Sequence, residues 1–268
     1  MTLEVIRNYR GNRATHHQLM RRLVTFDGWY VPIDVARRAT GRANFDTVCM
    51  YGDTCRHPAD QLWLFSSAED AMKAHEQTAA HTGHGLAPYA GPVAGAEVFA
   101  SLSRQLQAVV IDIVGGREDK WVIEGPALDV ARRWGQAVTV EKALHSCSDD
   151  VFVAMLGYDD YLVFETMGGS LATAPAADGS ASYVMAFTAI DAVELALMRY
   201  TGTLRKIATR SGRELFADIA EAGARGDGEL GLVINLAGPT PPMLPFEPAV
   251  CSHLAELARL LDVELRSA

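Results

Sequence analysis

Apolar residues in this chain gather in short runs that are separated by polar, glycine-rich or proline-rich stretches. Two runs, Val109–Val114 and Leu232–Leu236, are almost wholly apolar, which is typical of strands buried on both faces. Shorter, aromatic-rich runs at Trp29–Ile33 and Tyr161–Glu165 also predict strands. The pattern therefore indicates sheets with buried central strands.

The runs recur in the same order in the two halves of the chain. The offset between matching blocks is 132, 122 or 123 residues. The matching blocks are Phe26–Val31 with Tyr158–Val163, Leu62–Ser66 with Val184–Thr188, and Val109–Gly116 with Leu232–Pro239. Three blocks in one order predict a tandem duplication. We expect a first domain over residues 1–146, which begins with a helix, and a second domain over residues 147–268. The boundary is placed there because the junction Ser146–Asp150 is polar.

Helices are predicted between the strands of each half. A hydroxyl followed three residues later by an acid is a helix-start signal, and it occurs at Ser66 with Glu69 and at Thr188 with Asp191. The expected helices are Glu69–Ala80, Asp191–Tyr200, one around Val98-Phe99, one around Leu215-Phe216, Pro126–Gln136 and Pro248–Leu261. We therefore expect an α/β fold of the mixed α+β kind, with two similar small domains, each a mixed sheet flanked by helices.

These blocks resemble the SseB N-terminal domain family. Members show an aromatic-rich opening strand, a strand that ends in Phe-Thr or Phe-Ser before a helix, and a strand end of the Val-Ile-Asn-Pro-Gly kind. Leu232–Gly238 is closer to that strand end than Val109–Gly115, where Asp112 replaces the asparagine; Ile113 and Leu236 stand where the family has proline. The resemblance implies a small α/β domain without an established catalytic centre, in a family with some members near secretion genes.

Composition and charge narrow the function. The 268 residues are 49% hydrophobic and 21% charged, which excludes disorder along the whole chain. No apolar run reaches the roughly 20 residues that span a bilayer, and no secretory signal is visible, so we expect a cytoplasmic protein. The net charge of −9 argues against nucleic acids and anionic membranes as partners.

Motifs for catalysis, cofactors and metals are weak or missing. The sequence has no phosphate-binding loop and no nucleophile elbow, so we predict no cofactor and favour a protein that is not an enzyme. Two groups contain metal-ligand residue types, but neither has a standard ligand spacing, and we predict no metal at either. They are His75, His81 and His84, and Cys49, Cys55 and His57.

Asp112 and Asn235 end the two predicted central strands. Open α/β sheets bind ligands beyond such strand ends, so both side chains are candidates for lining a ligand pocket. The alternative is that each side chain bonds backbone in the following turn, as Asp and Asn commonly do. The Gly115-Gly116 and Gly238-Pro239 turns favour the alternative.

Two segments are candidates for binding a protein partner. Gly157–Tyr161 has the pattern of a tight hairpin tip, with Tyr158, Asp159, Asp160 and Tyr161 as contact residues, although Tyr161 could instead pack inward. The proline-rich segment Pro239–Phe246 offers Met243 and Phe246 on a stiff, extended backbone, unless these side chains fold back onto their own sheet.

The preferred hypothesis is a non-enzymatic protein-binding protein, such as an immunity or adaptor protein for a secreted toxin or a secretion component. An acidic surface favours a basic protein partner. The rival hypothesis is a small-molecule sensor or hydrolase with its site at the domain interface. A scaffold held together as a homodimer is a third alternative.

Overall fold

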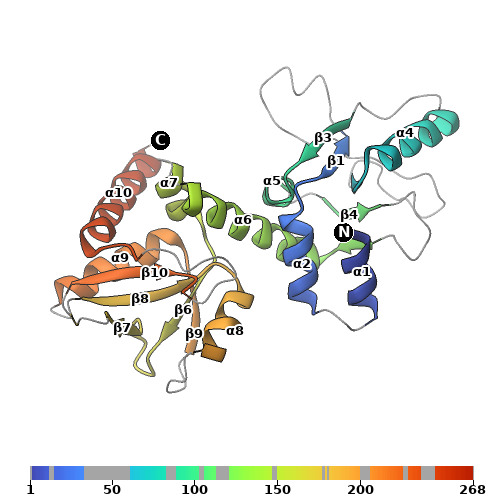
Figure 1. Ribbon diagram of the computed structural model, residues 1–268. Coiled ribbons are helices and arrows are strands. Elements are labelled where there is room, and N and C mark those ends of the chain that lie inside the picture. The colour runs from blue at the N-terminus through green and yellow to red at the C-terminus, as the bar shows by residue number, and fades with distance from the viewer. Residues whose placement is uncertain are drawn as a thin grey trace. The chain divides into compact units, whose positions relative to one another are not determined.

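The structure is a computed structural model, drawn as ribbons in Figure 1. It describes residues 2–11, 15–32, 61–82, 89–102, 106–112, 121–146, 150–176, 179, 181–199, 206–225, 229–236 and 245–267. The chain divides into two compact units, Met1–Val138 (unit 1) and Thr139–Ala268 (unit 2). The division falls inside a helix, α6, that ends at Ser146, where the sequence places the domain junction. Each unit combines helices with a mixed sheet, so the predicted mixed α+β class is confirmed.

Unit 1 opens with two helices and then builds its sheet. Its elements are α1 (Thr2–Arg10), α2 (His16–Thr25), β1 (Trp29–Pro32), β2 (Gln61–Leu64), α4 (Ala68–Thr82), β3 (Tyr89–Val93), α5 (Gly95–Ala100), β4 (Ala108–Ile111), β5 (Trp121–Glu124) and α6 (Pro126–Ser146). The strands run in the order β3-β1, β2-β4-β5. A pair of hydrogen bonds between the backbones of Tyr30 and Phe65, 2.8 and 3.0 Å long, joins the two groups. Among the strand pairs of unit 1 that the structure describes, β2 and β4 are parallel to each other and the other pairs are antiparallel.

Unit 2 has strands with the same order and directions. Its elements beyond α6 are α7 (Asp150–Gly157), β6 (Tyr161–Glu165), β7 (Thr173–Pro175), β8 (Ser182–Phe187), α8 (Ile190–Arg199), β9 (Lys206–Arg210), α9 (Gly212–Ala224), β10 (Leu230–Ile234) and α10 (Pro248–Ser267). The order is β9-β6-β8-β10, in which β8 and β10 are parallel and the other described neighbours are antiparallel. Phe246 pairs with Leu232 beyond β10, at the place that β5 takes beyond β4. The tandem duplication of the two halves stays a prediction.

The core of unit 2 lies on both faces of this sheet. Phe164, Met185 and Phe187 pack against the small residues of α8, and Phe164 meets Phe187 edge-to-face at 5.2 Å. The residues that alternate with these along β6 and β8, such as Val163 and Val184, are fully buried on the other face of the sheet. On that face α9 and α10 contact β10 (Figure 1). Alternating side chains therefore supply two apolar layers.

The same glycine contact fixes a helix in each unit. The N–H of Gly95 at the start of α5 donates to the carbonyl of Phe26, and that of Gly212 at the start of α9 donates to the carbonyl of Tyr158. A Cβ on Gly95 would lie 2.6 Å from the Val24 carbonyl oxygen, and one on Gly212 would lie 2.0 Å from the Met155 carbonyl oxygen. Only glycine lets these helices approach so closely.

Both predicted helix-start signals at Ser66 and Thr188 are wrong by a residue or more. In unit 1, Ser67 is the residue that caps α4: it accepts from the Asp70 N–H at 3.1 Å and donates to its carboxylate at 2.8 Å. In unit 2, α8 begins only at Ile190. Ser66 and Thr188 are instead bonded to the ends of the neighbouring strands, as described below.

Gly212→Ala should destabilise the protein by about 1–3 kcal/mol, because the new methyl group cannot fit against the Met155 backbone. Urea unfolding followed by circular dichroism measures the change. Gly157→Ala is the control, since no atom lies within 4 Å of its Cβ position and alanine is the better helix former. Equal stability of Gly212→Ala and the natural chain would contradict the close approach.

Candidate functional site

Asp112 and Asn235 hold the ends of adjacent parallel strands together. Both have left-handed backbone, with φ of 50° and 53°, and both are buried. The Ser66 N–H and hydroxyl donate to the two Asp112 carboxylate oxygens at 2.6 and 2.8 Å. The Thr188 N–H donates to Asn235 Oδ1 at 3.0 Å. The expected backbone bond is therefore made, but to the end of the neighbouring strand, 46 or 47 residues away.

In unit 2 the same arrangement is extended by a buried glutamate from α6. The Thr188 hydroxyl donates to Glu141 Oε1 at 2.5 Å, and Asn235 Nδ2 donates to the Thr188 hydroxyl at 2.8 Å and to Glu141 Oε1 at 3.3 Å. All three residues are buried. Because these polar atoms are used to bind one another, they act as a structural network, and we assign Asp112 and Asn235 no ligand.

The predicted contact loop around Tyr158 is not a hairpin tip. Residues 158–160 connect helix α7 to strand β6. The Tyr158 hydroxyl donates to the Thr188 carbonyl, and its ring packs edge-to-face on Tyr161 at 4.8 Å. Tyr158 is 3% exposed and Tyr161 is fully buried, so the expectation that Tyr158 contacts a partner is wrong, and Tyr161 packs inward. Asp159 is exposed and Asp160 is half-buried.

The remaining predicted residues have different outcomes. Phe246 is half-buried, and its backbone pairs with Leu232, so it extends the sheet. Met243, Cys49, Cys55, His57 and His84 lie outside the described residues, and nothing is described of the side chains of His75 and His81. Among the described residues no group of three or more His, Cys, Asp or Glu could hold a metal ion.

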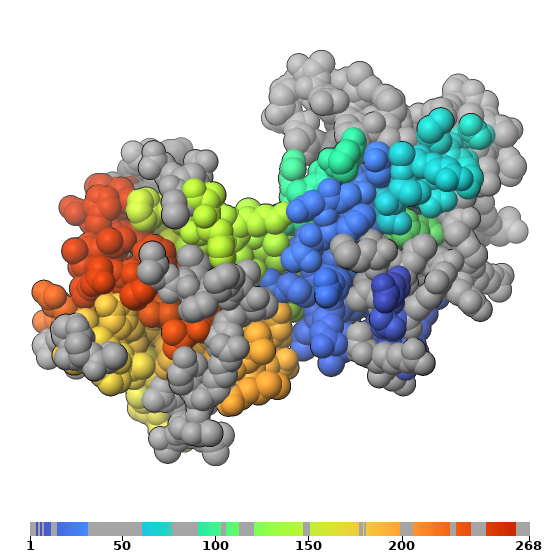
Figure 2. All heavy atoms as spheres, viewed as in Figure 1, coloured from blue at the N-terminus to red at the C-terminus, as the bar shows by residue number. Residues whose placement is uncertain are grey.

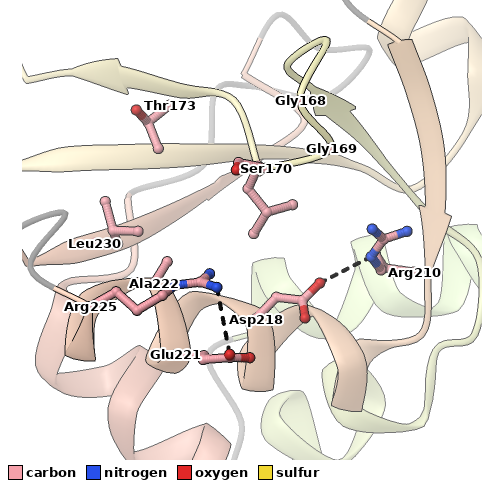
Figure 3. A pocket seen from close by; sticks show the side chains of 11 residues that line it. Gly168, Gly169, Ser170, Thr173, Arg210, Asp218, Glu221, Ala222, Arg225 and Leu230 are labelled. Atoms are coloured by element: carbon pink, nitrogen blue, oxygen red, sulfur yellow. Dashed lines mark hydrogen bonds and ion pairs between the residues drawn. The ribbon is translucent and has the colours of Figure 1, made fainter.

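A polar groove that the sequence did not predict lies in unit 2. Strand β6 leaves the sheet after Glu165, turns at Thr166–Ser170, and β7 takes its place beside β8. The space between this turn and α9 is a groove of about 620 Å³. Figure 3 shows the turn on one side and the side chains of α9 on the other. The lining residues are Gly168, Gly169, Ser170, Leu171, Thr173, Arg210, Asp218, Glu221, Ala222, Arg225 and Leu230.

Charged pairs occupy the two ends of the groove. Arg210 Nε donates to Asp218 Oδ2 at 3.0 Å, and Arg225 Nη1 lies 3.5 Å from Glu221 Oε1, as Figure 3 shows. Arg210 also donates to the buried carboxylate of Glu165. The hydrogen bond to Asp218, followed by that to Glu165, raises the pKa of Arg210 above its ordinary value, against the opposing effect of burial.

Net charge differs between the two units. Unit 1 contains 15 acidic and 15 basic residues, whereas unit 2 contains 18 acidic and 9 basic residues. The whole net charge of −9 therefore belongs to unit 2. Within the described parts of the chain, six of the eight large apolar side chains that are exposed also belong to unit 2. They are Val153, Met167, Leu197, Met198, Ile207 and Leu260; Leu197 and Met198 lie on α8, which Figure 2 shows in orange at the surface.

The comparisons with known proteins give no relative. No family model, no curated protein and no solved structure matches this chain. In the part of the chain that the structure describes, no helix is both long and apolar enough to cross a membrane.

Asn235→Asp should cost about 3 kcal/mol or more at neutral pH, because it replaces an amide donor by a second buried carboxylate beside Glu141. Asp112→Asn should cost about 1 kcal/mol, because the amide can still accept from the Ser66 N–H and donate to its hydroxyl. Protonation of the introduced carboxyl removes its repulsion of the neighbouring carboxylate, so the Asn235→Asp deficit should shrink as the pH falls from 7 to 5. Urea unfolding at both pH values checks this; equal costs for the two variants would contradict it.

Proposed function

We propose that this protein is a non-enzymatic protein-binding protein with two SseB-like domains, and that unit 2 binds a basic protein partner. The observation that carries the proposal is that the entire net charge of −9 lies in unit 2. A charge excess on one unit accelerates association with an oppositely charged protein. An immunity or adaptor role, for a secreted toxin or a secretion component, rests on the family resemblance.

Exposed apolar side chains on the same unit support a protein as the partner. Met167 is 90% exposed and precedes Gly168 on the rim of the polar groove. A flexible, polarisable Met side chain adapts to apolar surfaces of a partner. A free inorganic cation would gain nothing from such a contact, whereas a protein would gain from burying it.

Affinity purification of the tagged full chain from its source cell, at low ionic strength, tests the proposal. We expect a stoichiometric partner with a basic surface, whose affinity falls steeply as salt is added. If no stoichiometric protein is recovered, or if the recovered protein binds equally at low and high salt, the proposal is wrong.

Met167→Ser should weaken binding of that partner at least about tenfold, or about 1.4 kcal/mol, because the variant loses the apolar side chain that the partner would bury in the complex. The matched control is Met72→Ser on α4 of unit 1, where the natural side chain is 62% exposed. Calorimetry with purified partner measures both. Equal effects of the two substitutions would remove the rim of the groove from the interface.

Neutralising exposed acids of unit 2 should slow association. The triple variant Glu194→Gln, Glu229→Gln, Glu256→Gln should lower the association rate constant several-fold at low salt, with little change in dissociation. The control with the same charge change in unit 1 is Glu76→Gln, Glu97→Gln, Glu124→Gln. Stopped-flow mixing measures both rates, and an equal loss in the two triple variants would mean that the charge of unit 2 does not steer the partner.

A further inference from the structure

We propose that the groove between the Thr166–Ser170 turn and α9 binds the guanidinium group of an arginine side chain, contributed by the basic partner. The inference deepens the proposed function and rests on it for the source of the arginine. The binding chemistry itself depends only on the groove. Its volume of about 620 Å³ lies in the range of sites that enclose small ligands.

The two carboxylates of α9 would contact the guanidinium. Asp218 and Glu221 are three residues apart on α9, so their side chains lie on one face of the helix, and both line the groove. Asp218 uses only Oδ2 to accept from Arg210, and within the described residues Oδ1 accepts no hydrogen bond. An incoming guanidinium carries five donors in a planar fork, which matches carboxylate oxygens.

Arg210, which also lines the groove, uses only one oxygen of Asp218. Arg210 donates from Nε to Asp218, from Nη1 to the Thr209 carbonyl at 3.0 Å and from Nη2 to the Glu165 carboxylate. Glu165 is a second, buried carboxylate partner of Arg210, so Arg210 stays paired when Asp218 also accepts from a further donor. Lys206 lies 3.4 Å from Glu165 but is largely solvated and does not line the groove. Asp218 therefore remains available to a further cation.

The ion pair between Arg225 and Glu221 is weak, so another cation can replace Arg225 in it. Arg225 and Glu221 are separated by 3.5 Å, and both side chains are mostly exposed. Exposed pairs one helical turn apart contribute only about 0.3–0.5 kcal/mol. A partner arginine that reaches Glu221 can thus replace Arg225, which then moves into solvent.

The floor of the groove suits the stem of an arginine. Leu171, Ala222 and Leu230 line it with apolar atoms, and Ala222 and Leu230 are buried. Arginine buries its methylene stem along apolar surface while its head stays among polar groups. Figure 3 shows this arrangement, with Leu230 and Ala222 between the sheet and the charged side chains of α9.

An anion is the competing occupant, because Arg210 and Arg225 also line the groove. An anion would have to displace two carboxylates from Arg210, one of them buried, and would then lie beside Asp218 and Glu221. The charges that the fold has already placed therefore favour a cation.

NMR titration of the isotopically labelled full chain tests the inference without the partner. The probes are Nα-acetyl-arginine amide and the corresponding lysine, glutamine and glutamate compounds. The readout is the change in the backbone amide chemical shifts of Gly168, Gly169 and Ser170. We expect saturable shifts with the arginine probe, at least threefold weaker binding of the lysine probe, and none with the neutral or anionic probe. Saturation by the glutamate probe, equal binding of lysine and arginine, or no shift with arginine would each overturn the inference.

Paired variants place the binding at the two carboxylates. The double variant Asp218→Asn, Glu221→Gln should bind the arginine probe at least tenfold more weakly. The amide oxygen at position 218 still accepts from Arg210. Glu194→Gln with Glu256→Gln removes the same charge from exposed positions on α8 and α10 and should leave the affinity within about twofold. Equal losses in both pairs would show that only the general charge of unit 2 attracts the probe and would overturn the assigned site. Absence of arginine binding, together with a Met167-dependent partner, would reject this inference and leave the proposed function standing.

Discussion

A buried side chain at the end of a parallel strand fixes the connections of each unit. Asp112 in unit 1 and Asn235 in unit 2 adopt left-handed backbone, which costs most residues with a Cβ about 1–2 kcal/mol and costs Asp and Asn less. The hydrogen bonds offset this cost, since a buried bond to a charged group contributes about 1.5–3 kcal/mol and a neutral one about 1 kcal/mol. Because the partner is the backbone after the parallel neighbour strand, the same bonds fix where the chain leaves that strand for α4 or α8.

The sequence predicts those parts of the fold that depend on local pattern. Val109–Val114 and Leu232–Leu236 predict strands that are covered on both faces, because such strands need apolar residues at every position. Their places in the sheets differ from the prediction of two central strands: β4 lies between β2 and β5, whereas β10 lies beside β8 at the end of its strand order. The polar edge strand Lys206–Arg210 has no such pattern and was not predicted, since its stability comes from pairing with β6. Likewise α6 continues beyond the predicted Gln136 to Ser146, through residues that an isolated pattern does not distinguish from a linker.

The failures share one physical cause, which is that the decisive partners are distant in sequence. Ser66 and Thr188 have the hydroxyl of a helix cap, but Asp112 and Asn235 bind those hydroxyls from about 46 residues away. Tyr158 follows a glycine, as in an exposed turn, yet its hydroxyl reaches the Thr188 carbonyl in the core. The groove was missed for the same reason, because its charges come from β9 and α9 while its rim comes from the turn after β6.

The fold accounts for only some of the acidic residues of unit 2. Glu141 and Glu165 are buried and serve the internal network and Arg210, and Glu214 completes the cap of α9 with Ser211. Exposed residues such as Glu194 and Glu256 make no comparable bond within the part of the chain that the structure describes, and self-repulsion among such acids lowers the stability of the compact state. Their excess is therefore a property of the surface and not a requirement of the fold. A surface charge that the fold does not need is the kind of feature that association with an oppositely charged partner explains.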